Sequence, residues 1–449
     1  MIDSKVLKEN PNSVREMLSK RNMEFHLDDL FSLDKNRRNS IIELQNTNQK
    51  KNIIAKEIAT RRKNNIETID QIQEMNLIGE KIKALEKENR EIEEKYKKLL
   101  YNIPNFFHDS VPIGKDESAN KIIRVFDKYA SSDNVDTKYG HIATSGKDDN
   151  NDKTSVNTQI KNHIKISHEL DLLDLERAGK IAGARFYFLK NDLVKLGLAL
   201  TNFAIDYLIE REYVIVQPPY MIKKEAMEGA VILSDFEETI YKIENEDLYM
   251  IGTSEHPLAS MHMNEILEGK GLPLRYAGIS PCFRKEAGAH GKDMKGIFRV
   301  HQFDKVEQFI FSRPSESWKE HERLLETTEE FYRILDIPFR TIVLCSGDLG
   351  KVSAKTYDIE AWFPAQNAYR EICSCSNCTD YQSRSLKIRF RDNPNEETTL
   401  VHTLNSTLVA IQRTMVAIIE NYQTREGTIK IPLVLQKYMN NKEEIKLKN

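Results

Sequence analysis

Apolar residues recur at helical spacing from residue 28 to residue 100, a stretch that contains no proline and a single glycine, Gly79. In its second half they step by three and four, which is the spacing of a coiled-coil seam. Asn89 falls on this seam, where an amide sets the register at some cost in stability. The seam comprises Met75, Ile78, Ile82, Leu85, Asn89, Ile92, Tyr96 and Leu99.

The first half of this stretch has a less regular apolar stripe, which Arg37 and Lys51 interrupt. Residues 61–65 then break the pattern, and Thr68 with Gln71 predicts a capping box at the start of the next helix. Two helices of roughly 30 residues predict an antiparallel hairpin about 45 Å long, at 1.5 Å per residue. The predicted stripe comprises Leu30, Ile41, Leu44, Ala55 and Ile58.

Beyond the hairpin the pattern changes at Pro104, which disfavours helix at the residue before it. Residues 128–163 are poor in apolar side chains and predict a flexible linker or insertion. From residue 164 the composition indicates a compact α+β domain. There we predict an amphipathic helix over 193–212, a strand over 213–217 that two prolines stop, and a long helix over 407–422.

Composition narrows the class of protein. The chain has 449 residues, 40% hydrophobic and 30% charged, with a net charge of −3, so any nucleic-acid surface must be local rather than global. Five cysteines do not form a disulfide framework and favour a reducing compartment. Without an apolar leader or an apolar run approaching 18 residues, we expect a cytoplasmic protein that does not enter membranes.

The charge of the predicted hairpin is uneven. Basic residues outnumber the two acidic ones, Glu43 and Glu57, from residue 35 to residue 63, whereas the second helix is nearly balanced. Such a helix is a candidate for tracking RNA phosphates, and a solvated structural or dimerisation coil remains the alternative. The candidate RNA contacts are Lys35, Arg37, Arg38, Lys50, Lys51, Lys56, Arg61, Arg62 and Lys63.

A second hairpin is predicted where strand-like runs over 274–283 and 297–311 flank a glycine-rich loop. It carries Arg284 and Glu286 before the loop, and Arg299 and Phe303 after it. A guanidinium forks onto phosphate oxygens and an aromatic ring can cover a base, so this combination points to a nucleotide.

Further polar residues suit a small substrate and a metal ion. Thr253 and Glu255 lie two apart after a predicted strand over 248–251 and could receive an ammonium group; alone, they would equally cap a helix over 256–267. Glu307 alternates with apolar neighbours and, alone, reads as an exposed edge residue. Glu371 and Ser374 offer the oxygen ligands that Mg²⁺ prefers. The three cysteines of 373–378 lack a fourth zinc ligand, so we expect no structural zinc.

The 281–303 segment resembles the second signature motif of class II aminoacyl-tRNA synthetases, in the form found in seryl-tRNA synthetases. The resemblance continues through 176–189, 403–413, 420–424 and Pro432. The chain departs from the family in its longer polar stretch 128–163 and in Ser406-Thr407, which is similar to archaeal and eukaryotic members. The resemblance implies a tRNA-binding domain over 1–110 with its coiled-coil arm at 28–100, a connector over 111–163, and a catalytic domain over 164–449 with an antiparallel sheet flanked by helices.

The resemblance also implies the roles of individual residues. Arg284, Glu286 and Arg413 would be catalytic, although a single arginine such as Arg413 is by default a surface residue. Mg²⁺ would accompany ATP at Glu371 and Ser374. The implied serine-binding residues are Thr253, Ser254, Glu255, Arg284, Glu307, Asn405 and Thr407. The implied ATP-binding residues are Arg284, Lys285, Glu286, Val300, Phe303, Glu371, Ile372, Cys373, Ser374 and Arg413.

The activity that the resemblance implies is ATP-dependent activation of L-serine to seryl-adenylate, followed by transfer to tRNA(Ser), with tRNA(Sec) left open. It further implies a homodimer whose arm grips the long variable arm of the tRNA. Two other functions are weighed against it. An amino-acid:carrier-protein ligase would lack the long arm, and a noncatalytic binding paralogue would have broken motifs.

Overall fold

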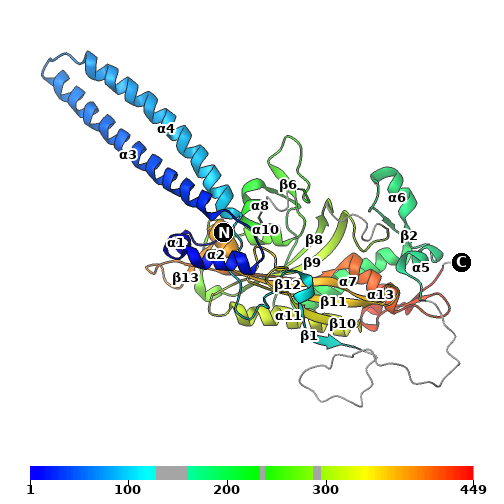
Figure 1. The fold of residues 1–449 in the computed structure, drawn as a ribbon. Helices are drawn as coiled ribbons and strands as arrows, with labels where there is room; N and C mark the ends of the chain where they lie inside the picture. Colours follow the sequence, from blue (N-terminus) through cyan, green and yellow to red (C-terminus); the bar gives the residue numbers. More distant parts are fainter. Residues whose placement is uncertain (128–159, 233–237, 287–294, 448–449) are drawn as a thin grey trace. The chain divides into compact units, whose positions relative to one another are not determined.

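A computed structural model describes residues 1–127, 160–232, 238–286 and 295–447 of the chain (Figure 1). These residues form two compact units. One comprises Met1–Ser19 with Met23–Pro104, and the other comprises Lys20–Asn22 with Asn105–Asn449. Within the described ranges, no helix has the length and apolar character needed to cross a membrane.

The first unit is dominated by two antiparallel helices, α3 (Leu27–Lys63) and α4 (Ile69–Tyr101), which follow α1 (Ser4–Glu9) and α2 (Pro11–Lys20) (Figure 1). They form the predicted hairpin with 37 and 33 residues, and Ile82, Leu85 and Tyr96 of the predicted seam are buried. We call this hairpin, residues 27–101, the arm.

Two details of the arm differ from the prediction. Ala55 is exposed and its neighbour Ile54 is buried, because the contacts with α4 follow the steps from Ile54 to Ile58. Thr68 stands at the N-cap of α4 but its side chain makes no capping hydrogen bond, so the capping box is wrong. Asn89 is half-buried and its amide nitrogen donates to the Ser40 carbonyl at 3.5 Å.

The second unit is built on an eight-stranded sheet in the order β1-β10-β11-β12-β15-β9-β8-β4. All neighbours are antiparallel except β4 and β8. In chain order the strands are β1 (Lys121–Phe126), β4 (Val214–Val216), β8 (Leu274–Phe283), β9 (Gln302–Ser312), β10 (Phe339–Val343), β11 (Lys355–Phe363), β12 (Ala368–Thr379) and β15 (His402–Ala410).

Helices cover the two faces of this sheet unequally. The larger core joins the sheet to α7 (Asn191–Ile209), α11 (Ser317–Ile334) and α13 (Ile411–Asn421), where Phe203 stacks on Phe331 at 4.8 Å between ring centroids. A smaller core on β8 and β9 involves α8 (Lys224–Ala230), α10 (Glu255–Ser260) and α12 (Tyr381–Leu386). The remaining part of this second face is open and forms the site described below.

Short elements complete the unit. The helices are α5 (His163–Glu169), α6 (Leu175–Ala182) and α14 (Leu433–Gln436). The strands are β2 (Leu173–Asp174), β3 (Phe188–Leu189), β5 (Met221–Lys223), β6 (Leu248–Met250), β7 (Ile266–Glu268), β13 (Arg389–Arg391), β14 (Thr399–Leu400), β16 (Ile429–Lys430) and β17 (Glu444–Ile445).

Three predicted elements are wrong in part. Residues 407–410, the start of the predicted helix over 407–422, belong to β15 instead, because they continue its antiparallel ladder with β9. The helix over 256–267 ends at Ser260. The strand after the glycine-rich loop begins at Gln302 rather than 297, since the amides of Ile297 and His301 bond to His163 and Arg185 instead of β8.

The predicted connector over 111–163 is partly structural. Its residues Lys121–Phe126 form β1 and pair with β10, so they extend the sheet. Residues 128–159 of the predicted insertion lie outside the described residues. At its end Asn162 caps α5, where its side chain accepts a hydrogen bond from the Lys165 amide.

Candidate active site

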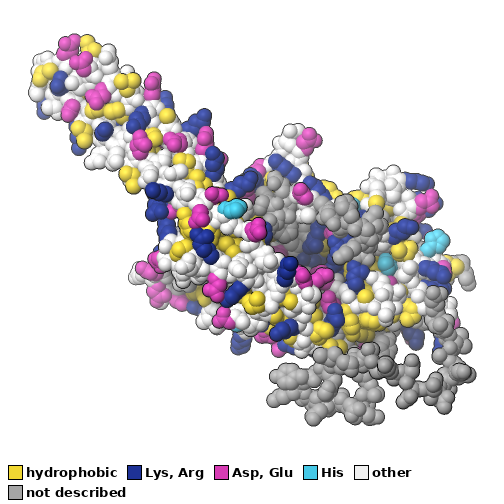
Figure 2. Space-filling view, in the orientation of Figure 1, with side chains coloured by type: hydrophobic (Ala, Val, Ile, Leu, Met, Phe, Trp, Pro, Cys, Tyr) yellow, Lys and Arg dark blue, Asp and Glu magenta, His cyan; other side chains and the backbone are white. Residues whose placement is uncertain are grey.

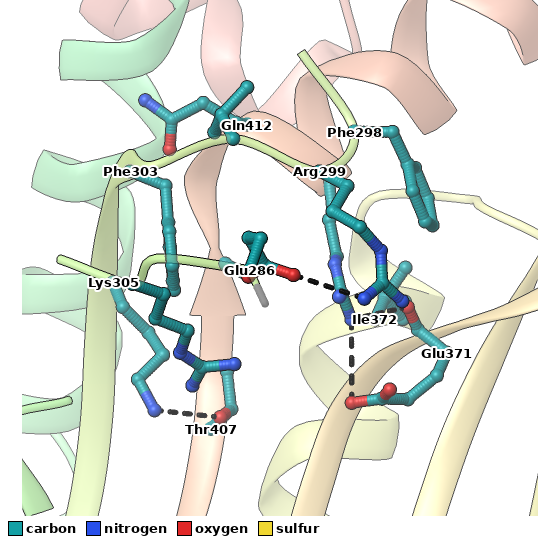
Figure 3. Close-up of a pocket in the computed structure, with 13 residues that line it drawn as sticks. Glu286, Phe298, Arg299, Phe303, Lys305, Glu371, Ile372, Thr407 and Gln412 are labelled. Carbon is teal, nitrogen blue, oxygen red and sulfur yellow. Dashed lines mark hydrogen bonds and ion pairs between the residues drawn. The ribbon is translucent and has the colours of Figure 1, made fainter. Parts of the chain in front are cut away.

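A cleft with about 490 Å³ of empty space lies on the open face of the sheet. It is bordered by the end of β8, by β9, β12 and β15, and by the start of α13 (Figure 3). Charged groups dominate its lining, with three arginines and one lysine facing two glutamates. These residues are Arg284, Arg299, Arg413, Lys305, Glu286 and Glu371.

Strand alternation decides which side chains reach this face. On β9, Val306 and Ile310 enter the larger core. Phe303, Lys305 and Glu307 occupy the alternate positions of the strand and point the opposite way, so they share the open face. On the neighbouring β15 the same alternation presents Thr403, Asn405 and Thr407, which lie opposite Phe311, Phe309 and Glu307 in the ladder.

The pair Glu307–Thr407 sits directly opposite in the register of β9 and β15. The Thr407 hydroxyl donates to Glu307 Oε2 at 3.0 Å, and Lys305 Nζ forms a salt bridge to the same oxygen at 2.5 Å. All three side chains are buried, and Lys305 points toward Thr407 at the cleft wall (Figure 3). Glu307 is therefore an internal carboxylate held by a cation and a hydroxyl, not an exposed edge residue.

A β-bulge places the predicted metal ligands together. Opposite Ile359 and Glu360 of β11, the register of β12 skips Ile372. In a regular strand, Glu371 and Ser374 would face opposite sides; the extra residue brings both to one face. Arg413 lies 3.4 Å from the Glu371 carboxylate and lowers its pKa. The Ser374 side chain hydrogen-bonds Asp358, so an acidic, oxygen-rich corner adjoins the cleft.

Arg284 follows β8 directly and is held on both sides. Its Nε donates to the Gly252 carbonyl at 3.2 Å, and its guanidinium lies 5.1 Å from the centre of the Phe303 ring. Beyond it, Glu286 accepts a hydrogen bond from Arg299 at 3.0 Å (Figure 3). The loop residues 287–294, which include Gly288 and Gly291, lie outside the described residues.

Gly278 allows the segment 252–255 to approach the sheet closely. A Cβ at this position would lie 2.8 Å from both Cβ and Oγ of Ser254. Ser254 is fully buried and its hydroxyl donates to the Gly278 carbonyl at 3.2 Å, so it anchors the segment. Thr253 accepts from the Glu255 amide at 3.1 Å, which leads the chain into α10.

Glu255 is the carboxylate that this segment delivers to the pocket. Its Oε1 accepts from the side-chain amides of Gln382 at 2.9 Å and Asn405 at 3.1 Å. Burial and then the nearby Glu307 raise the pKa of Glu255 to about 7. The adjacent His256 accepts from the Gly252 amide, and burial lowers its pKa to about 3, so it is neutral and structural.

Two protein-family models match the sequence of this chain. The model of the seryl-tRNA synthetase N-terminal domain matches residues 1–107, and that of the class II tRNA synthetase core domain (G, H, P, S and T) matches residues 238–422. A serine–tRNA ligase of Nitrosopumilus maritimus is 55% identical over 99% of this chain and 100% of its own length. The chain belongs to the seryl-tRNA synthetase family. It therefore has the class II synthetase fold, an N-terminal helical domain followed by a mixed α/β catalytic domain.

Solved structures agree over the whole length. The seryl-tRNA synthetase of Pyrococcus horikoshii, complexed with ATP, has a TM-score of 0.82 and 44% identity, and the alignment covers 100% of both chains. The cytoplasmic enzyme of Naegleria fowleri, in complex with AMP, has a TM-score of 0.77 and 37% identity over 98% of this chain and 96% of that one. The predicted family and fold class are thus confirmed.

Several predicted site residues cannot use their side chains in the cleft. The Cys373 thiol points into the larger core toward Tyr332 and Leu408. Ser254 is anchored as described. Lys285 reaches back toward the Tyr241 ring at 5.8 Å, and its amide donates to Thr239. Any contact of these three with a ligand would therefore involve the backbone or a rearrangement.

Sequence reasoning missed other residues of the site. Lys305 and Gln382 contact predicted ligands directly, and Phe298 lines the cleft, with the Arg413 guanidinium 5.1 Å from its ring centre. Lys305 could have been found from its two-residue offset from Phe303 and Glu307. Gln382 had no such signal, because it lies on a separate helix, more than 70 residues after Glu307 along the chain.

The nine basic candidates on the arm divide into two groups. Arg37 is half-buried between the helices, bonded to Asp34 and Glu93, with its guanidinium 4.6 Å from the Tyr96 ring centre. Arg38 is exposed but also pairs with Asp34 at 3.0 Å. The remaining seven are exposed. Figure 2 shows side chains of both charges along the visible face of the arm.

Proposed function

We propose that this chain is a serine–tRNA ligase, which activates L-serine with ATP and transfers the seryl group to tRNA(Ser). The observation that carries the proposal is the juxtaposition of two carboxylates, the half-buried Glu255 and the buried Glu307, with an arginine-lined cleft. The two carboxylates suit the ammonium and hydroxyl groups of a small amino acid. The cleft suits the phosphates of a nucleotide.

Serine recognition would rest on Glu307 and Thr407. Both are buried and already hydrogen-bonded to each other, so a serine hydroxyl would join an existing polar network. Alanine would leave these groups without the partner that the substrate supplies, which makes rejection strong. Glu255 would receive the serine ammonium, and Asn405 orients its carboxylate.

ATP would bind along the cleft. Arg284 would hold the α-phosphate, Phe303 would stack on the adenine, and Arg413 would meet the outer phosphates. Glu371 and Ser374 fit Mg²⁺, because the bulge aligns two oxygen ligands beside the cleft; when bound, the ion would neutralise phosphate charge. The serine carboxylate would then attack the α-phosphorus in line, releasing pyrophosphate.

Catalysis in this scheme requires no protein nucleophile. The chain's residues bring the carboxylate and the phosphate together and supply positive charge where negative charge accumulates. Arg284 is prepared for this task, since the Gly252 carbonyl and the Phe303 ring already fix its orientation. Transfer to the terminal adenosine of the tRNA would complete the cycle.

The arm would contact tRNA through its exposed basic residues, and we assign Arg37 and Arg38 mainly to the packing of the arm. We further propose a cytoplasmic homodimer. The edge strand β4 and the outer face of α7 support the dimer, because Val214, Leu198 and Ile209 expose 58%, 60% and 55% of their surfaces.

ATP–pyrophosphate exchange over a panel of amino acids tests the function. We expect exchange with serine and very little with alanine or threonine, and charging of tRNA(Ser) transcripts under the same conditions. Absence of exchange with serine would contradict the proposal. Normal exchange without any tRNA charging would favour a ligase that loads a carrier protein.

A further inference from the structure

Gln382 is a buried glutamine that ties three separate segments to the proposed serine pocket. It lies on α12 with no exposed surface. Its side-chain nitrogen donates to the Ala230 carbonyl at 2.9 Å and to Glu255 Oε1 at 2.9 Å, and its oxygen accepts from the Thr403 hydroxyl at 2.7 Å. The orientation of the amide is determined, because a backbone carbonyl such as that of Ala230 can only accept.

Glu255 therefore has two amide donors on one oxygen. Gln382 and Asn405 both donate to Oε1, at 2.9 and 3.1 Å. Hydrogen bonds to an ionised carboxylate favour its charged form. Because both donors use Oε1, the structure leaves Oε2 as the oxygen that we assign to the substrate ammonium.

The surroundings of Glu255 make these donors consequential. Glu307 from β9 and burial disfavour its charge, whereas Lys305 from β9 and Arg284 beyond β8 favour it. From β12 the Cys378 thiol also faces it, and the neighbouring His256 is neutral. The carboxyl thus titrates near neutral pH, where the loss of one donor changes its ionised fraction.

We propose that Gln382 is a positioning residue for serine binding, which keeps the Glu255 carboxylate ionised and aimed at the substrate ammonium. The inference rests on the proposed function of the pocket. Gln382 itself touches no substrate. Its partners Ala230 and Thr403 hold the amide in place, so that α12 becomes part of the amino-acid site without lining it.

The test is the pH dependence of serine-supported ATP–pyrophosphate exchange in Gln382→Met. We expect the acid limb of kcat/KM for serine to move up by about one pH unit, the rough effect of one donor on a buried carboxylate. At pH 7 the KM for serine should rise about fivefold, because a one-unit rise in the pKa of Glu255 lowers its ionised fraction by that factor. The KM for ATP should stay within about twofold of the wild-type value.

Gln308→Met is the matched control. Gln308 is equally buried, but its nitrogen donates to Thr328 on α11, on the opposite face of the sheet. We expect a comparable loss of stability without movement of the acid limb. Thr403→Val supplies a milder second variant, which removes the donor that orients Gln382; it should shift the limb in the same direction by less.

The outcomes separate the two levels of inference. A folded Gln382→Met with an unchanged acid limb, or an equal rise in the KM for ATP, would overturn the positioning role. If Gln382→Met does not fold, Thr403→Val decides by the same criterion. Failure of the wild-type protein to exchange with serine at any pH would instead overturn the proposed function.

Discussion

Replacing Glu255 with glutamine should stabilise the protein while impairing serine binding. The folded environment raises the pKa of this carboxyl from 4.5 to about 7, mainly through burial. The ionised form of Glu255 therefore destabilises the folded state, although the proposed function requires it. Glutamine has nearly the same shape and carries no charge, and its oxygen can still accept from Gln382 and Asn405.

The magnitude and sign follow from linkage between ionisation and folding. Below pH 4.5 both states are protonated and the carboxyl contributes nothing. Between pH 4.5 and 7 the unfolded chain releases its proton first, so stability falls as pH rises. The shift to about 7 corresponds to a penalty of about 1 kcal/mol at pH 5 and about 3 kcal/mol at pH 8.

Urea unfolding of wild type and Glu255→Gln at pH 5 and pH 8, at one protein concentration, measures this difference. Comparison at each pH cancels the other titrating groups. We expect a gain in the variant that is larger by about 2 kcal/mol at pH 8 than at pH 5. A variant that is less stable at pH 8, or a gain independent of pH, would refute the reasoning.

Glu307→Gln is the contrasting control, because it makes the same chemical change in the same pocket. Glu307 pairs with the buried Lys305 at 2.5 Å, so its loss leaves a buried cation without its partner. We expect this variant to be less stable than wild type at pH 8, by about 3 kcal/mol for a fully buried pair. The two substitutions should thus have opposite signs.

Three further predictions concern activity. In wild type, kcat/KM for serine should fall about tenfold per pH unit below about pH 7 as Glu255 is protonated, and a pH-independent profile between 5 and 7 would contradict this. Replacing residues 61–63 with alanine should weaken tRNA charging while sparing ATP–pyrophosphate exchange. The slope of log tRNA affinity against log salt concentration should fall by the equivalent of about three phosphate contacts. The control is the equally charged and exposed α4 set Lys83, Lys87 and Arg90, and an equal loss there would argue against a specific basic tip. Gly278→Ala should displace Ser254, 2.8 Å away, and raise the KM for serine at least tenfold in exchange assays, with a smaller effect on ATP.

Local pattern predicted much of the architecture. The coiled-coil seam of α4 and strand β8 follow from side-chain periodicity, which depends on neighbours a few residues apart. The helix predicted over 407–422 was wrong in its first part, because residues 402–410 contain apolar positions compatible with either period. Pairing with β9, and with β12 over residues 403–406, selects the extended form.

The sequence by itself determined the family and the chemical types of the site residues, since the motifs carry unusual side chains at particular spacings. Tertiary structure alone decided which of them meet. A bulge at Ile372 turns Glu371 toward Ser374, and Thr407 reaches Glu307 from the adjacent strand β15. Gln382 reaches Glu255 from a separate helix. Such contacts, and the pKa of about 7 that burial imposes on Glu255, depend on distances through space that spacing along the chain does not encode.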